Sequence, residues 1–165
     1  MNAEEQRVQD ALDGLGLDTR VRVFDKPTHT SQEAADAAGC ELGQIAKTLA
    51  FDVDGALVLV IIGGASRVDT SKLARCLSVP HKRVRMMPAE TVVEKTGFAV
   101  GGVPAIGHDP QPRTLIDQGL LVYEEIWSAA GSSNAIFPIA SSDLVRVTGA
   151  KAGDFSRSRD DGAGS

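Results

Sequence analysis

The sequence predicts a mixed α/β (α+β) domain with a largely antiparallel or mixed sheet. Strand-like and helix-like segments alternate, but without the regular spacing of βαβ units. The clearest pair of strands, residues 47–53 and 56–62, is joined by Asp54-Gly55, which is typical of a type I′ hairpin turn. The second of these runs, ALVLVII, is apolar on both faces, so we expect a central strand that is covered on both sides.

The helices are predicted from apolar spacing and from their end signals. Residues 3–14 carry one apolar stripe, and Thr30 with Glu33 forms a capping box that opens an alanine-rich helix ending at Gly39. Three more helices are expected: from Asp69 or Thr70 to Leu77, from Pro88 to Lys95, and from a cap at Ser142-Asp143 to Thr148. Short strands are expected at residues 21–24, 115–117, 125–127 and 135–137.

Length and composition indicate one domain, residues 1–150, followed by a polar tail. A chain of 165 residues buries enough apolar surface to fold without a disulfide or a metal. The last stretch, residues 151–165, is rich in Gly and Ser and is expected to be flexible.

The charge and the termini restrict the class of protein. A net charge of −5 argues against a protein that coats a nucleic-acid backbone, although it permits one that grips only the end of an RNA. The N-terminus is polar and acidic, and no apolar run approaches the ~20 residues that a membrane span needs. Cys40 and Cys76 are expected to be reduced thiols. These features favour a soluble cytoplasmic protein with no membrane partner.

Several catalytic motifs are missing from the sequence. It contains no phosphate-binding GxxxxGK[ST] loop, no full dinucleotide fingerprint, no GxSxG serine motif and no zinc spacing among its His and Cys residues. We therefore expect no metal site, no cofactor and no covalent nucleophile. If the protein is an enzyme, it acts by positioning its substrate and by electrostatic stabilisation.

The most informative segment is residues 96–108, in which four glycines and Pro104 fall within thirteen positions. Such a loop exposes backbone N–H groups and lets a ligand approach the main chain. The N–H groups of Gly101, Gly102 and the residues after Pro104 are the candidate donors to an oxyanion. The alternative is a tight helix-to-strand turn without a ligand.

With two further segments, this loop resembles the YbaK/EbsC family, freestanding relatives of the editing domain inserted in bacterial prolyl-tRNA synthetases. The two segments are Ala46-Lys47-Thr48-Leu49 and residues 128–134, where Ser128-Ala129-Ala130-Gly131 is followed by Asn134. The resemblance implies a mixed, partly barrel-like sheet surrounded by helices. It also implies hydrolysis, in trans, of the ester that joins a wrong small amino acid, such as Ala, Cys or Ser, to a tRNA, above all tRNA for proline.

The resemblance suggests roles for individual residues. Lys47 matches a lysine that matters for activity in the family, where an ammonium holds a phosphate or ribose or stabilises developing charge; a solvated lysine at a strand end is the alternative. The candidate catalytic residues are Lys47, Gly101, Gly102 and His108, the last as a proton shuttle. The candidate substrate-binding residues are Thr30, Thr48, Val103, Pro104, Gly131, Ser132 and Asn134. Pro104 comes one residue earlier than in the Gly-Gly-x-Ser-Pro pattern of relatives, which predicts an altered pocket.

The implied partners are the acceptor end of a mischarged tRNA and, as a candidate, prolyl-tRNA synthetase. The basic run His81–Arg85 is either a contact to the tRNA acceptor stem or a solvated loop. Two other functions stay open: a module that binds aminoacyl-adenosine, the tRNA 3′ end or a synthetase without turnover, and a hydrolase of small esters or thioesters that ignores RNA.

Overall fold

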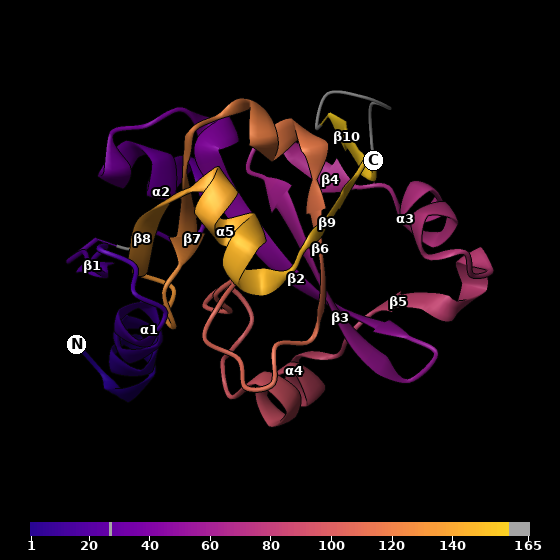
Figure 1. Ribbon diagram of the computed structural model, residues 1–165, viewed down its shortest axis with the longest axis horizontal. Coiled ribbons are helices and arrows are strands. Elements are labelled where there is room, and N and C mark those ends of the chain that lie inside the picture. Colours follow the sequence, from indigo (N-terminus) through magenta and orange to yellow (C-terminus); the bar gives the residue numbers. More distant parts are fainter. Residues whose placement is uncertain (27, 159–165) are drawn as a thin grey trace.

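A computed structural model describes residues 1–26 and 28–158. It is built around one large mixed sheet with helices on both sides (Figure 1). In the described residues this sheet has eight strands in the order β1-β8-β7-β2-β3-β6-β9, with β5 paired to one end of β2. A second, two-stranded sheet joins β10 to β4. The mixed α/β class expected from the sequence is confirmed.

The strands of the large sheet combine parallel and antiparallel pairs. β2 pairs antiparallel with β3 and β5 but parallel with β7, and β6 lies parallel to both β3 and β9. The bounds of the strands are β1 Arg22–Val23, β2 Ile45–Val53, β3 Ala56–Gly63, β4 Ser66–Val68, β5 Val84–Met86, β6 Arg113–Asp117, β7 Glu125–Ala129, β8 Ala135–Ala140, β9 Lys151–Gly153 and β10 Ser156–Ser158.

The β2–β3 hairpin is the centre of the sheet, as the sequence predicts. Asp54 and Gly55 both have positive φ, at 54° and 84°, which is the signature of a type I′ turn. Alternate residues of β3 enter two different cores: Leu59 and Ile61 lie on one face, and Val58, Val60 and Ile62 lie on the other. The expectation of a doubly covered central strand is therefore confirmed.

Helices cover both faces of the sheet (Figure 1). One core joins the sheet with residues of α1, α4, α5 and the Gly-rich loop, which is the name used here for residues 96–108. Helices α2 and α3 belong to two separate clusters. The bounds of the α-helices are α1 Ala3–Gly14, α2 Ser31–Ala38, α3 Thr70–Leu77, α4 Ala89–Thr96 and α5 Ser141–Thr148. Within the part of the chain that the structure describes, three 3-10 turns connect elements: η1 Leu42–Gln44, η2 His81–Arg83 and η3 Gln118–Val122.

Helix starts follow the sequence signals except at α5. Thr30 accepts from the Glu33 N–H at 3.0 Å in the expected capping box, and Asp69 caps α3. α5 was expected to begin after a cap at Ser142-Asp143, but it begins at Ser141, directly after β8, with no side-chain cap. Ser141 instead joins the preceding 3-10 turn, because its hydroxyl donates to the Tyr123 carbonyl at 2.6 Å.

The expectation of a flexible tail from residue 151 is wrong for the part that the structure describes. Lys151–Gly153 forms β9 and Ser156–Ser158 forms β10, while the Phe155 side chain between them is fully buried. The carboxylate of Asp117 accepts from the Phe155 N–H at 3.2 Å and from the Ser156 hydroxyl at 2.9 Å. One buried aromatic and one buried carboxylate therefore anchor this segment. Residues 159–165 lie outside the described residues.

None of the helices in residues 1–26 and 28–158 combines the length and the apolar character needed to cross a bilayer. Among the same residues, the His, Cys, Asp and Glu side chains form no group of three suited to holding a metal ion.

Candidate functional site

The candidate site lies at a gap along one edge of β2. β7 pairs with β2 only at Ile45 and Ala46, and β5 pairs with it only from Phe51 onward. In between, the Met87 N–H donates to the Ala50 carbonyl at 3.1 Å. Backbone groups alternate along a strand, so the N–H and C=O of Thr48, two residues before Ala50, point to the same open edge. The sheet thus presents backbone polar groups in its middle.

A cavity of about 190 Å³ fills this gap. Most of its wall is apolar, including Ile45, Met87, Val92 and Ile136. Seven polar side chains contribute to the described lining: Thr28, His29, Thr30, Ser31, Lys47, Thr48 and Ser132. A mostly apolar hollow with a few convergent polar groups is the usual form of a small-molecule site.

Lys47 and Thr48 both line this cavity although they project from opposite faces of β2. Alternation alone predicts that Thr48 points away from Lys47. Both side chains can line the cavity because no described strand pairs with this edge of β2 at that point, and the cavity extends around the open edge. Lys47 Nζ donates to the Ser66 carbonyl of β4 at 2.8 Å, which ties the ammonium to the segment that follows β3.

Thr48 carries an unusual polar group. Its Oγ1 is buried and has no hydrogen-bond partner among the described residues. A buried hydroxyl without a partner destabilises a fold by about 1–3 kcal/mol, and a ligand that bonds to it would remove that cost. This observation marks Thr48 as a candidate substrate contact.

The Gly-rich loop contributes fewer free N–H groups than expected. The Gly102 N–H donates to the Ala99 carbonyl at 2.9 Å, and the Ala105 N–H donates to Ser128 Oγ at 3.2 Å. The expectation that these two groups serve an oxyanion is therefore corrected. Gly101 and Val103 line the cavity, and their N–H groups have no acceptor among the described residues. They are the remaining candidate donors.

Pro104 and His108 are absent from the cavity lining and form a structural pair. His108 Nε2 lies 2.8 Å from the Pro104 carbonyl oxygen, and because a carbonyl only accepts, this nitrogen carries the proton. The His108 ring also meets Phe98 edge-on at 5.8 Å between centroids. Burial lowers the pKa of His108, the Pro104 hydrogen bond opposes that shift, and the charge of Arg7 adds to it. This geometry fixes the His108 ring within the loop and outside the cavity lining, so a proton shuttle at His108 stays a prediction.

Gly131, Ser132 and Asn134 form the second wall, but only Ser132 reaches the cavity. The Gly131 N–H donates to the Gly102 carbonyl at 2.9 Å, which ties the two loops together. Asn134 Nδ2 donates to the Phe24 carbonyl at 3.0 Å, so this amide is used within the fold. Ser132 Oγ lies 2.7 Å from a carboxylate oxygen of Glu5.

Sequence reasoning missed the lining residues that come from outside the three segments. Thr28, Ala34, Met86, Met87 and Val92 all contribute to the wall. Their types are ordinary core or loop residues, so no local signal distinguished them. Only the pairing of β5 beside β2 brings Met86 and Met87 to the cavity.

The cavity combines the open edge of β2, the Lys47 ammonium, the buried Thr48 hydroxyl and the Gly-rich loop. Together these features define a site for a polar group attached to a small apolar moiety. The comparisons with known proteins agree with that class. Residues 25–147 match the family described as "Aminoacyl-tRNA editing domain". The chain belongs to this family, which confirms the YbaK-like resemblance.

The chain is also similar to individual proteins over most of their length. "Uncharacterized protein YwhH" of Bacillus subtilis (strain 168) is 27% identical over 132 residues, covering 79% of this chain and 82% of that protein. The crystal structure of a "putative trans-editing enzyme for prolyl tRNA synthetase" is 36% identical with a TM-score of 0.89, covering 95% of this chain and 99% of the other. "Hypothetical protein APE2540" is 32% identical with a TM-score of 0.83, covering 92% and 99%.

Proposed function

We propose that this protein is a trans-acting aminoacyl-tRNA deacylase. It hydrolyses the ester between a small, wrong amino acid and the 3′ end of a tRNA, with tRNA for proline as the first candidate. The observation that carries the proposal is the cavity at the β2 gap, where Lys47, Thr48 and Gly101 converge. The family match supports an editing role, and a similar structure is named a "putative trans-editing enzyme for prolyl tRNA synthetase".

The cavity wall favours a small amino acid side chain. Its volume of about 190 Å³ is shared between the amino acid and whatever part of the ribose enters. Five alanines contribute short side chains to the wall: Ala34, Ala46, Ala50, Ala129 and Ala135. Alanine, cysteine and serine are therefore the candidate substrates. Each additional methylene changes selectivity by about 1–3 kcal/mol, so discrimination within this group depends on fine packing.

The reaction needs only positioning and charge stabilisation. Water adds to the ester carbonyl carbon, negative charge develops on the carbonyl oxygen, and the bond to the ribose oxygen then breaks. The proton lost by the water is taken up by the departing ribose oxygen, which leaves a free amino acid and an intact tRNA. The Lys47 ammonium and the N–H groups of Gly101 and Val103 stabilise the oxyanion, while Thr48 Oγ1 orients the substrate.

No carboxylate lines the described part of the cavity. A carboxylate general base is therefore not part of the proposal. We further propose that the protein acts in the cytoplasm, where tRNA is charged, and that it cooperates with prolyl-tRNA synthetase.

A second candidate follows from the correction to the Gly-rich loop. The Gly102 and Ala105 N–H groups are bonded inside the protein, which leaves a smaller set of oxyanion donors. The same cavity would then hold an aminoacyl-adenosine end without turnover. Binding of a non-hydrolysable aminoacyl-adenosine analogue, with no ester hydrolysis, would favour this alternative.

The deciding experiment measures deacylation of proline tRNA charged in turn with alanine, cysteine, serine and proline. We expect loss of one non-cognate ester and sparing of the proline ester. Lys47→Ala should lower the rate by about 100-fold or more, as for removal of one electrostatic donor to an oxyanion. Lys151→Ala, an exposed lysine on β9, is the matched control and should act as wild type. Full activity of Lys47→Ala would refute the role of this lysine.

A further inference from the structure

The positive charges of this chain are concentrated in one segment. Residues 66–88, which run from β4 through α3 and η2 to β5, hold six of the 17 Lys and Arg residues. Asp69 is the only acidic residue in that segment, although the whole chain has a net charge of −5. The remainder of the molecule is therefore more acidic than the net charge suggests.

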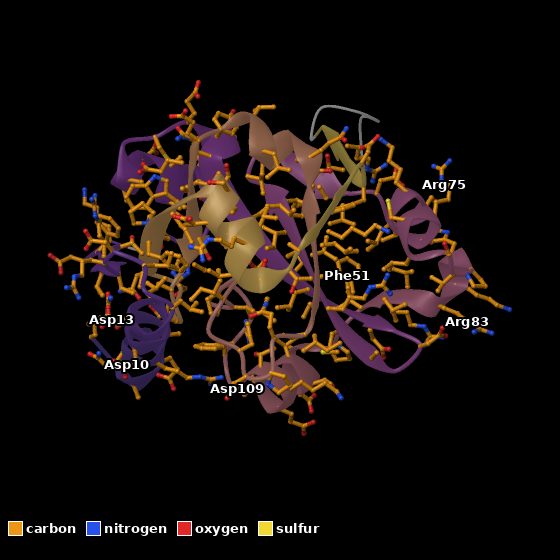
Figure 2. The ribbon with its side chains drawn as sticks, viewed as in Figure 1. Asp10, Asp13, Phe51, Arg75, Arg83 and Asp109 are labelled. Carbon is orange, nitrogen blue, oxygen red and sulfur yellow. The ribbon has the colours of Figure 1, made fainter. Side chains whose placement is uncertain are left out.

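Four exposed side chains form what we call the cationic surface: Arg75, Lys82, Arg83 and Arg85. Arg75 lies on α3, Lys82 and Arg83 on η2, and Arg85 on β5. Figure 2 shows Arg75 and Arg83 projecting outward at one end of the molecule, while Asp10 and Asp13 project from α1 at the opposite end. An anionic partner is accordingly attracted to one end and repelled from the other.

The cationic surface is not fully neutralised by its neighbours. Arg83 Nη1 lies 3.3 Å from Asp54 Oδ1, and Arg85 is the cross-strand partner of Asp52. Within the described residues no ion pair is recorded for Arg75, Lys82 or Arg85. Lys82, Arg83 and Arg85 also line a groove of about 350 Å³, together with Asp52, Asp54 and Gly55. Three cationic side chains against two carboxylates leave the groove with a net positive charge.

The cationic surface adjoins the cavity described above. Arg85 is followed directly by Met86 and Met87, which line the cavity wall. Along β2, Thr48 and Asp52 are four residues apart, or about 13 Å at the rise of a strand. A polymer whose end enters the cavity would therefore pass over Arg85 and then Lys82.

We propose that the cationic surface binds the phosphate backbone of the base-paired stem next to the 3′ end of the RNA substrate. This inference rests on the proposed function, which places the terminal aminoacyl nucleotide in the cavity. Side chains of Arg and Lys on an exposed surface contact phosphates without reading bases. The surface thus supplies affinity and orientation, and the cavity supplies selectivity for the amino acid. Because the rest of the chain is acidic, only the cationic surface attracts RNA phosphates, and the contact is restricted to the end of the RNA.

The test measures binding of an uncharged RNA hairpin that carries an acceptor-type stem and an unpaired 3′ end. Fluorescence anisotropy gives its Kd over a series of salt concentrations for three proteins. The test variant is Arg75→Gln/Lys82→Gln/Arg85→Gln. The matched control is Lys95→Gln/Arg113→Gln/Lys151→Gln, which removes the same charge from exposed positions outside the segment. A single-stranded RNA with the same 3′ end, but without the stem, is the second probe.

We expect the test variant to bind the hairpin about tenfold more weakly or worse at low salt. The slope of log Kd against log salt should fall by about 2–3, one for each phosphate contact removed. The control triple should keep the wild-type slope, and binding of the stemless RNA should change little in both variants. Thermal unfolding of each variant confirms that it is folded.

Equal weakening by both triple variants, or an unchanged salt slope in the test variant, would overturn the proposal. Wild-type protein that does not bind the hairpin would also overturn it. The readout does not depend on catalysis. Suppose that hairpin binding is lost only in the test variant, while the wild-type protein hydrolyses no aminoacyl ester. The proposal for the cationic surface would then be supported, and only the proposed function would be refuted.

Discussion

The carboxylate of Glu5 and the hydroxyl of Ser132, 127 positions apart in the sequence, lie 2.7 Å from each other. Glu5 is only 3% exposed, and its second oxygen accepts from the Asn2 N–H at 2.7 Å in a capping box. The start of α1 therefore supports the wall of the cavity that carries Ser132. Gly131 approaches the same helix so closely that an added Cβ would lie 2.7 Å from the Glu4 carbonyl oxygen.

Replacing Glu5 should weaken the fold. Glu5→Ala removes the carboxylate half of the α1 capping box and leaves Ser132 without its carboxylate partner, so we expect a loss of about 1–3 kcal/mol in the free energy of unfolding. Chemical denaturation measures it. Glu4→Ala removes an exposed carboxylate from the same helical turn and should stay within about 0.5 kcal/mol of wild type. Similar losses in the two variants would contradict the role given to the Glu5–Ser132 contact.

Thr48→Val should separate activity from stability. The Oγ1 atom is buried without a partner, so replacing the hydroxyl by a methyl group leaves the free energy of unfolding unchanged or raises it. If the substrate completes this group, kcat/KM for aminoacyl-tRNA should fall by about 2–10-fold, the value of one neutral hydrogen bond. Thr48→Ser keeps the hydroxyl and is the control. Unchanged kcat/KM in Thr48→Val would exclude the proposed contact.

Gly102→Ala should disturb the junction of the two loops. The added Cβ would lie 2.9 Å from the Ser132 nitrogen and 3.0 Å from the Gly131 carbonyl, and these backbone atoms cannot move independently. We expect a loss of about 1–3 kcal/mol in thermal or chemical unfolding, as in other overpacked sites. Gly14→Ala, where an added Cβ meets nothing within 4 Å, is the matched control. A neutral effect at Gly102 would show that the loops are not packed as described.

His108 should make stability depend on pH. Burial lowers its pKa in the folded protein, so the unfolded chain binds the proton more readily. Stability from this group is complete above the usual histidine pKa of about 6.5 and is lost as pH falls from there toward the lowered value. His108→Gln should have a smaller decrease in Tm between neutral and mildly acidic pH than wild type. His29→Gln, at an exposed position, should follow wild type; an equal decrease in all three proteins would count against His108.

Phe155→Ala tests whether the C-terminal strands belong to the domain. The ring is fully buried in a cluster with Leu73 and Val60, so truncation should cost about 3–5 kcal/mol. Asp154→Ala, the preceding residue, removes only an exposed ion pair with Lys72 and should change stability by less than about 1 kcal/mol. Denaturant unfolding distinguishes the two. A flexible tail would make both variants indistinguishable from wild type.

The sequence by itself determined the elements whose signals are local. The hairpin turn needs only two residues that tolerate positive φ, and Asp54-Gly55 supplies both of them. The capping box of α2 needs Thr30 and Glu33 three positions apart, and the two faces of β3 follow from its unbroken apolar run. Lys47 and Thr48 were identified because they stand in a short motif, and both line the cavity.

The tertiary structure decided which of the candidate groups are free to act. Gly102 and His108 carry the right chemistry, but backbone atoms from the same loop occupy their donors. The Ser132 hydroxyl donates to Glu5 from the opposite end of the chain, and the buried Phe155 side chain anchors part of the polar C-terminal segment in the core. Hydrogen bonds and burial depend on which distant segments meet, and no spacing within a short motif encodes that. The elements are thus local properties of this chain, whereas the site is a property of its long-range packing.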